Sequence, residues 1–67
     1  MKPLPKIRRA FTRLYSDNRQ LSAYVEWSDG ARTEGRAIAP LKPAGTHMEQ
    51  LFARATREGM EVTHEQW

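Results

Sequence analysis

Apolar and polar residues alternate from Leu21 to Trp27. One side of this segment carries Leu21, Ala23, Val25 and Trp27, and the other carries Ser22, Tyr24 and Glu26. Strict alternation is typical of a half-buried strand. Asp29-Gly30 follows and is a strong hairpin signal, so we expect a second strand from Ala31 to about Ile38, ended by Pro40 and Pro43.

The side-chain pairing favours one loop length for this hairpin. A two-residue loop would place Trp27 beside Arg32, so that a core side chain would face a charge. A three-residue loop, with Gly30 in the left-handed conformation, instead places Glu26 opposite Arg32. It also makes three apolar or small pairs, namely Trp27 with Ala31, Val25 with Thr33, and Ala23 with Gly35. We therefore expect the three-residue loop and a helix packed closely against the small residues of the second strand.

The C-terminal third predicts a helix and a short strand. Thr46-His47-Met48-Glu49 has the spacing of a capping box, and Gly59 suits a left-handed helix end. Between them lies an apolar stripe at helical spacing, formed by Met48, Leu51, Phe52 and Ala55. Met60 to His64 alternates again and predicts a short last strand.

Residues 7–15 fit two structures. Ile7, Ala10, Phe11, Leu14 and Tyr15 match the template of an amphipathic helix. The same segment can form a strand, because a turn at residues 16–19 gives sensible cross-strand pairs: Leu14 with Leu21, Thr12 with Ala23, Ala10 with Val25, Phe11 with Tyr24, and Arg9 with Glu26. We favour the strand because a third strand supports a lone hairpin.

The predicted fold class is therefore α+β. It is a three-stranded antiparallel meander with one C-terminal helix packed on one face, in the order β-β-β-α with a short last strand. The order α-β-β-α-β is the alternative. The β-β-β-α order resembles that of the small arm-type DNA-binding domains of phage and transposon integrases. The resemblance lies in element order alone, and it implies DNA binding without identifying any functional residue.

Charge is distributed unevenly along the 67 residues. Residues 1–19 contain six Lys and Arg side chains and one Asp, whereas residues 20–67 contain five cations and seven carboxylates. A basic N-terminal segment followed by a mildly acidic remainder can attract an anionic partner to one part of the protein. The length suits one small domain over residues 1–67, with residues 1–6 as a flexible basic N-terminus.

The chain lacks the motifs of common catalytic and metal sites. It has no Cys, its two His residues lie outside any metal spacing, and it has no glycine-rich phosphate loop. We therefore expect a binding module without catalytic activity, metal or cofactor. Since the start leads into no long apolar stretch, we also expect no membrane segment and a cytoplasmic location.

A strand at residues 7–15 would place basic and aromatic residues together on the outer face of the sheet. This face would carry Ile7, Arg9, Phe11, Arg13, Tyr15, Tyr24, Glu26, Arg32, Glu34 and Arg36. Cations that contact phosphates and rings that stack on bases predict nucleic-acid binding, with DNA as the expected ligand. The candidate cations are Lys2, Lys6, Arg8, Arg9, Arg13, Arg19, Arg32 and Arg36, and the candidate rings are Phe11, Tyr15 and Tyr24.

The alternative function is a protein-interaction module or homodimer that uses the same face, through exposed Phe11 and Tyr15, to regulate or inhibit a larger partner. An acidic protein surface is then the expected partner in place of nucleic acid. Both hypotheses require that the N-terminal cations stand together on one exposed side. Pairing with carboxylates such as Glu26 and Glu34 would remove that surface.

Overall fold

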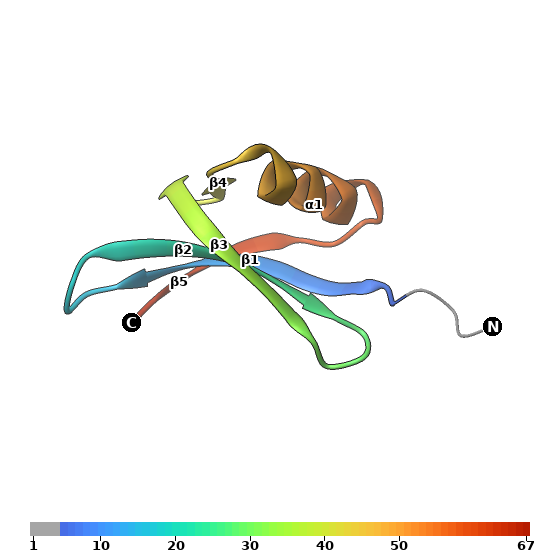
Figure 1. Cartoon of the computed structure of the whole chain (residues 1–67), viewed down its shortest axis with the longest axis horizontal. Coiled ribbons are helices and arrows are strands. Elements are labelled where there is room, and N and C mark those ends of the chain that lie inside the picture. The colour runs from blue at the N-terminus through green and yellow to red at the C-terminus, as the bar shows by residue number, and fades with distance from the viewer. Residues whose placement is uncertain (1–4) are drawn as a thin grey trace.

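The computed structural model describes residues 5–67, which form one sheet and one helix (Figure 1). The strands and the helix follow in the order β1 (Ile7–Tyr15), β2 (Gln20–Trp27), β3 (Arg32–Ala39), β4 (Lys42–Pro43), α1 (Thr46–Arg57) and β5 (Val62–Gln66). Residue 2 and most of the predicted flexible N-terminus lie outside the described residues. Lys6 is joined to Ser28 by two hydrogen bonds, one from its N–H to Oγ (2.9 Å) and one from the Ser28 N–H to its carbonyl (2.7 Å).

The sheet order is β4-β3-β2-β1-β5, and the helix covers one face (Figure 1). β1, β2 and β3 form the predicted antiparallel meander, whereas β5 returns beside β1 and runs parallel to it. The sheet is curled into a half-barrel. The α+β prediction with a last strand is confirmed, and the α-β-β-α-β alternative is excluded because residues 7–15 form a strand. Within residues 5–67, the single helix is too short and too polar to span a membrane.

β1 and β2 pair in the predicted register. Thr12 lies opposite Ala23, Phe11 opposite Tyr24, and Arg9 opposite Glu26. One detail of the prediction is wrong: Ile7 belongs to the core under the helix rather than to the outer face. A bulge between Ile7 and Arg9 is the reason, since one extra residue reverses the side to which Ile7 points.

The β2–β3 hairpin has the predicted three-residue loop. The Trp27 N–H donates to the Ala31 carbonyl (2.9 Å), and Glu26 lies opposite Arg32. Gly30 adopts a φ of 91°, a conformation that favours glycine. Asp29 Oδ1 accepts a hydrogen bond from the Ala31 N–H (3.0 Å), which fixes the loop from within.

The predicted helix is confirmed, but the predicted capping box is wrong. Gly45 is the N-cap, with φ 92° and ψ 144°, and no side chain caps this end. Because Thr46 is already helical, it lacks the extended backbone with which an N-cap hydroxyl reaches back to the first turn. At the other end Gly59 has the expected positive φ of 84°, and the Met60 N–H donates to the Ala55 carbonyl (2.9 Å), which closes the last turn.

The helix packs on the sheet through its predicted stripe. Met48, Phe52 and Ala55 are buried, and Leu51 packs against the same cluster at its edge. The sheet contributes Ile7, Ala10, Ala23 and Val25. Gly35 allows the helix to approach β3 closely, since a Cβ there would lie 2.6 Å from Met48 Cγ.

Candidate nucleic-acid interface

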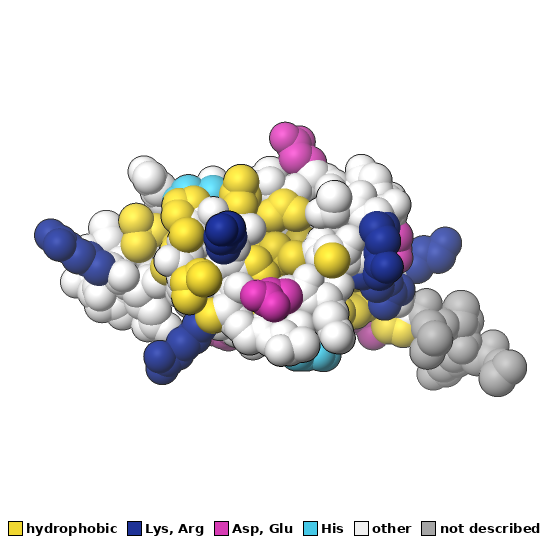
Figure 2. Space-filling model, turned by 90° about the horizontal axis from the view of Figure 1, so that it is seen from above, with side chains coloured by type: hydrophobic (Ala, Val, Ile, Leu, Met, Phe, Trp, Pro, Cys, Tyr) yellow, Lys and Arg dark blue, Asp and Glu magenta, His cyan; other side chains and the backbone are white. Residues whose placement is uncertain are grey.

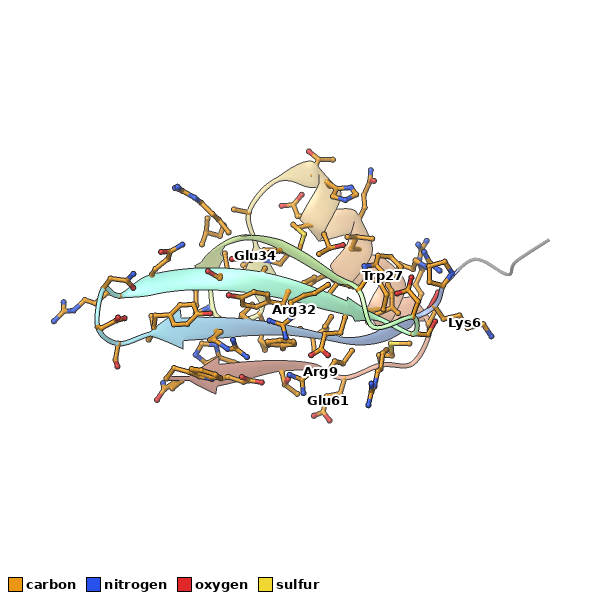
Figure 3. The ribbon with its side chains drawn as sticks, turned by 60° about the horizontal axis from the view of Figure 1, so that its bottom comes forward. Lys6, Arg9, Trp27, Arg32, Glu34 and Glu61 are labelled. Atoms are coloured by element: carbon orange, nitrogen blue, oxygen red, sulfur yellow. The ribbon has the colours of Figure 1, made fainter. Side chains whose placement is uncertain are left out.

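The helix-free outer face of the sheet is organised in rows across the strands. One row runs from Arg9 through Glu26 to Arg32. The next joins Thr63, Phe11, Tyr24 and Glu34, and the third joins Glu65, Arg13, Ser22 and Arg36. Figure 3 shows Arg9, Arg32 and Glu34 on this side of the sheet. Each candidate cation of the face therefore lies in a row with at least one carboxylate.

Arg13 is the centre of the face and is 9% exposed. Its Nε and Nη2 each donate to Glu65 Oε2 at 3.2 Å, and its Nη1 donates to Tyr15 Oη at 3.3 Å. The guanidinium lies 3.9 Å from the ring centroid of Trp67 and 5.1 Å from that of Tyr24. Cation–π contacts of this kind are strongest where water is excluded. Arg13 thus holds the face together and is not available to a ligand.

Arg9 is paired on both sides. Its Nε lies 2.7 Å from Glu26 Oε1, and its Nη2 lies 3.1 Å from Glu65 Oε1. Its guanidinium also lies over the Phe11 ring, 4.1 Å from the centroid. The expectation that the N-terminal cations form one unpaired surface is therefore wrong for Arg9 and Arg13, because strand pairing brings Glu26 and Glu65 to them.

The network shifts the pKa values of its members. Burial raises the pKa of Glu65, but hydrogen bonds from Trp67 and Arg13 and the charges of Arg13 and Arg9 outweigh it, so that this pKa lies below its usual value. Burial lowers the pKa of Arg13, and its bonds to Tyr15 and Glu65 reverse that effect and raise it. A lowered pKa for Glu65 and a raised pKa for Arg13 mean that both groups of this ion pair stay charged at neutral pH.

Two tyrosines extend the network across the sheet. Tyr15 Oη and Tyr24 Oη are 2.6 Å apart. The pKa of Tyr15 is lowered, chiefly by its hydrogen bonds with Tyr24 and Arg13, whereas burial raises the pKa of Tyr24. Every buried side-chain polar atom in the described residues has a hydrogen-bond partner. The hydrogen bonds among Arg13, Glu65, Tyr15 and Tyr24 therefore leave none of these buried atoms unsatisfied, which is typical of a network that stabilises the fold.

Two of the three candidate stacking rings are inaccessible. Phe11 is 0% and Tyr24 is 2% exposed, and the two rings stack on each other with centroids 5.1 Å apart. The expectation of an exposed Phe11 is wrong because guanidinium groups and the curled sheet cover it. Tyr15 is half-buried and meets Trp67 edge-on, with centroids 6.2 Å apart.

The other candidate cations are exposed but dispersed. Among residues 5–67, none of the following forms an ion pair with a described carboxylate: Lys6, Arg8, Arg19, Arg32 and Arg36. Lys and Arg side chains stand near both ends of the long axis of the molecule, which is 43 Å in extent (Figure 2). Lys2 lies outside the described residues. Arg32 and Arg36 are the two unpaired candidates that share one strand and one face.

The sequence analysis did not identify Glu65 and Trp67 as residues of the outer face, because it assigned no face to the last segment. The parallel pairing of β5 with β1 brings Glu65 opposite Arg13. The Trp67 N–H donates to the Leu14 carbonyl (2.8 Å), and Trp67 Nε1 donates to Glu65 Oε2 (3.0 Å). The alternation of Thr63, Glu65 and Trp67 was the signal that could have placed them on one side of a strand.

In residues 5–67 no group of three His, Asp or Glu side chains is placed to hold a metal ion. Comparison of the chain with known protein families, curated proteins and solved structures finds no match.

Proposed function

We propose that this protein binds DNA through the β3 side of the outer face, with Arg32 and Arg36, in place of the N-terminal cations, as the contacts to the phosphate backbone. The observation that carries the proposal is the arrangement of these two side chains. Both are exposed, both point to the same side of β3, and neither is paired with a described carboxylate. Four residue-to-residue steps along the strand place their Cα atoms roughly 13 Å apart, at about 3.3 Å per step.

The ion pairs of the neighbouring strands support this role, because they leave Arg32 without a carboxylate partner. Glu26 is the cross-strand partner of Arg32, but its carboxylate is occupied by Arg9 at 2.7 Å. The Arg32 guanidinium instead lies 5.5 Å from the Tyr24 ring centroid, a contact that orients it without neutralising it. Arg9 and Arg13 thus stabilise the sheet through their ion pairs. Because these pairs occupy the carboxylates of Glu26 and Glu65, Arg32 and Arg36 on β3 stay available to phosphates.

The spacing suits a duplex. The major groove is about 12 Å wide and admits a two-stranded ribbon, so arginines roughly 13 Å apart can reach phosphates on both of its walls. Glu34 lies between them on the same face, opposite Tyr24. Its negative charge lies close to both arginines and weakens the attraction of this part of the face to phosphates. Lys6 and Arg8, exposed at the start of β1, add positive charge to the chain.

The test compares single charge removals in the full chain. Fluorescence anisotropy with a mixed-sequence duplex, over a series of salt concentrations, measures affinity and salt dependence. We expect R32Q and R36Q each to weaken binding and to reduce the slope of log K against log salt by about 0.9, the value for one phosphate contact. R57Q removes the same charge from the exposed last turn of α1 and should leave the slope unchanged. Equal losses in all three variants, or no binding by the wild type at low salt, would refute the proposal.

A further inference from the structure

A second surface lies on the helix side of the sheet, where β3, β4 and α1 meet. Ile38 is 72% and Leu41 is 48% exposed, and both are large apolar residues. Beside them is a groove of about 260 Å³ lined by Ile38, Lys42, Pro43, Glu49 and Phe52. Figure 2, which looks onto the helix, shows hydrophobic side chains gathered in a patch on this side of the molecule. An apolar projection and an apolar groove thus adjoin each other.

The backbone of Leu41 has a left-handed conformation, which favours glycine over leucine. The turn from Ala39 to Lys42 has Pro40 followed by Leu41 with a φ of 68°, as in a type II turn, where the second central position prefers Gly. Its N–H makes only a long hydrogen bond, 3.4 Å, to Thr12 Oγ1. A glycine would adopt this backbone without strain, so the packing of residues 5–67 does not account for an exposed leucine here. Such an outlier points to a role for the side chain outside the fold.

The groove suits a protein side chain. Its volume is below the roughly 300 Å³ at which small-molecule pockets begin. Addition of a strand is disfavoured at this edge, because Pro43 in the two-residue strand β4 has no N–H to donate. The surface is therefore fitted for the insertion of an aliphatic side chain between two folded surfaces.

The charges at the rim of the groove indicate which protein inserts it. Lys42 and Glu49 both line the groove, and neither has an ion-pair partner among residues 5–67. One cation and one carboxylate beside an apolar projection and an apolar groove form a self-complementary set. In a dimer with two-fold symmetry, the projection of each copy meets the groove of the other, and the cation of each copy meets the carboxylate of the other. An isologous dimer requires a surface that is complementary to itself in this way.

We propose that this surface joins two copies of the chain. Ile38 of each copy enters the groove of the other, next to Phe52 and Pro43, and Leu41 covers the contact. Lys42 of each copy pairs with Glu49 of the second copy. Neither Arg32 nor Arg36 lines the groove, so the two proposed contacts use different residues. The inference is independent of the proposed DNA binding.

The test uses reversed charges. In K42E both groove-rim charges become negative, and in E49K both become positive, so each variant alone should repel its own copy. Their mixture should form a heterodimer, since both crosswise pairs are then restored, and the double variant K42E/E49K should dimerise with itself. Sedimentation equilibrium of the full chain from micromolar to millimolar concentration measures each species.

Two further variants separate association from folding. I38D changes a side chain that is already 72% exposed, and it should give a monomer with the thermal stability of the wild type diluted until its dimer has dissociated. L41G should give a more stable fold together with weaker association, a combination that loss of folding cannot produce. A wild type that is monomeric at millimolar concentration overturns the proposal, and so does a dimer that is unaffected by I38D. A mixture of K42E and E49K that stays monomeric would likewise contradict it.

Discussion

Met48 Cγ lies 2.6 Å from the place that a Cβ on Gly35 would occupy. This contact sets the distance between α1 and β3, because Gly35 offers no side chain and Met48 fills the space above it. Gly35→Ala should therefore destabilise the protein by about 1–3 kcal/mol, the usual cost of overpacking a core. The measurement is the free energy of unfolding in urea.

A second background makes this prediction specific. Met48→Ala removes the atoms that the new methyl group would meet, so Gly35→Ala should cost much less in that variant than in the wild type. Equal costs in the two backgrounds would show that the helix does not contact β3 at this point.

The hairpin loop depends on the positive φ of Gly30, where an added Cβ would meet no other atom. Gly30→Val should destabilise the fold by about 1–2 kcal/mol through backbone strain alone, because a β-branched residue resists this conformation. Gly30→Asn is the matched control, since Asn tolerates positive φ and should cost less. A thermal melt in which Val and Asn behave alike would contradict the three-residue loop.

Arg13 should contribute far more to stability than an exposed arginine with a similar ion pair. Its side chain is 10% exposed and it joins Glu65, whereas Arg54 is 39% exposed in its pair with Glu58. We expect Arg13→Ala to cost about 2–3 kcal/mol, somewhat below the range for a fully buried pair because Glu65 is partly exposed. Arg54→Ala should cost about 0.5 kcal/mol or less. Similar costs in urea unfolding would show that the central network adds no stability.

Stability should fall in acid through Glu65. The pKa of this carboxyl is lowered in the folded protein from its ordinary value of 4.5. Its contribution is therefore complete above pH 4.5, the unfolded value, and is lost as the pH falls through the lower folded value. The difference in unfolding free energy between pH 7 and pH 3 should be smaller in Glu65→Gln than in the wild type. Glu61→Gln removes an exposed carboxylate that has no ion pair among residues 5–67 and serves as a control, and an equal reduction there would contradict the assignment to Glu65.

Glu34 should oppose binding to the phosphate backbone if β3 is the contact strand. Its carboxylate lies between Arg32 and Arg36 on the same face. Glu34→Gln should strengthen binding to mixed-sequence duplex at low salt, because a repulsive charge is removed while both arginines remain. Anisotropy titrations measure this, with Glu61→Gln, which removes an exposed carboxylate outside β3, as control. Weaker binding by Glu34→Gln would contradict the role of β3 as the strand that contacts phosphates.

Signals along the chain were enough to predict the elements and the register of the meander. Alternation in residues 21–27, the Asp29-Gly30 turn and the pairing of Arg9 with Glu26 are local or depend on neighbouring strands, so their energetics can be read along the chain. The helical stripe and the glycine at the C-terminal end of the helix are local signals of the same kind. The failed capping box was also local, but Gly45 took the N-cap position one residue earlier.

Which cations remain unpaired could not be predicted, because it follows from the packing of distant segments. Glu65 and Arg13 are separated by 52 residues and meet because β5 returns parallel to β1, a pairing that no local signal reveals. The same return and the curl of the sheet bury Phe11 and Tyr24 under guanidinium groups. Burial and ion pairing depend on contacts between distant segments, so charge counted along the chain could predict a basic protein without locating its exposed cations.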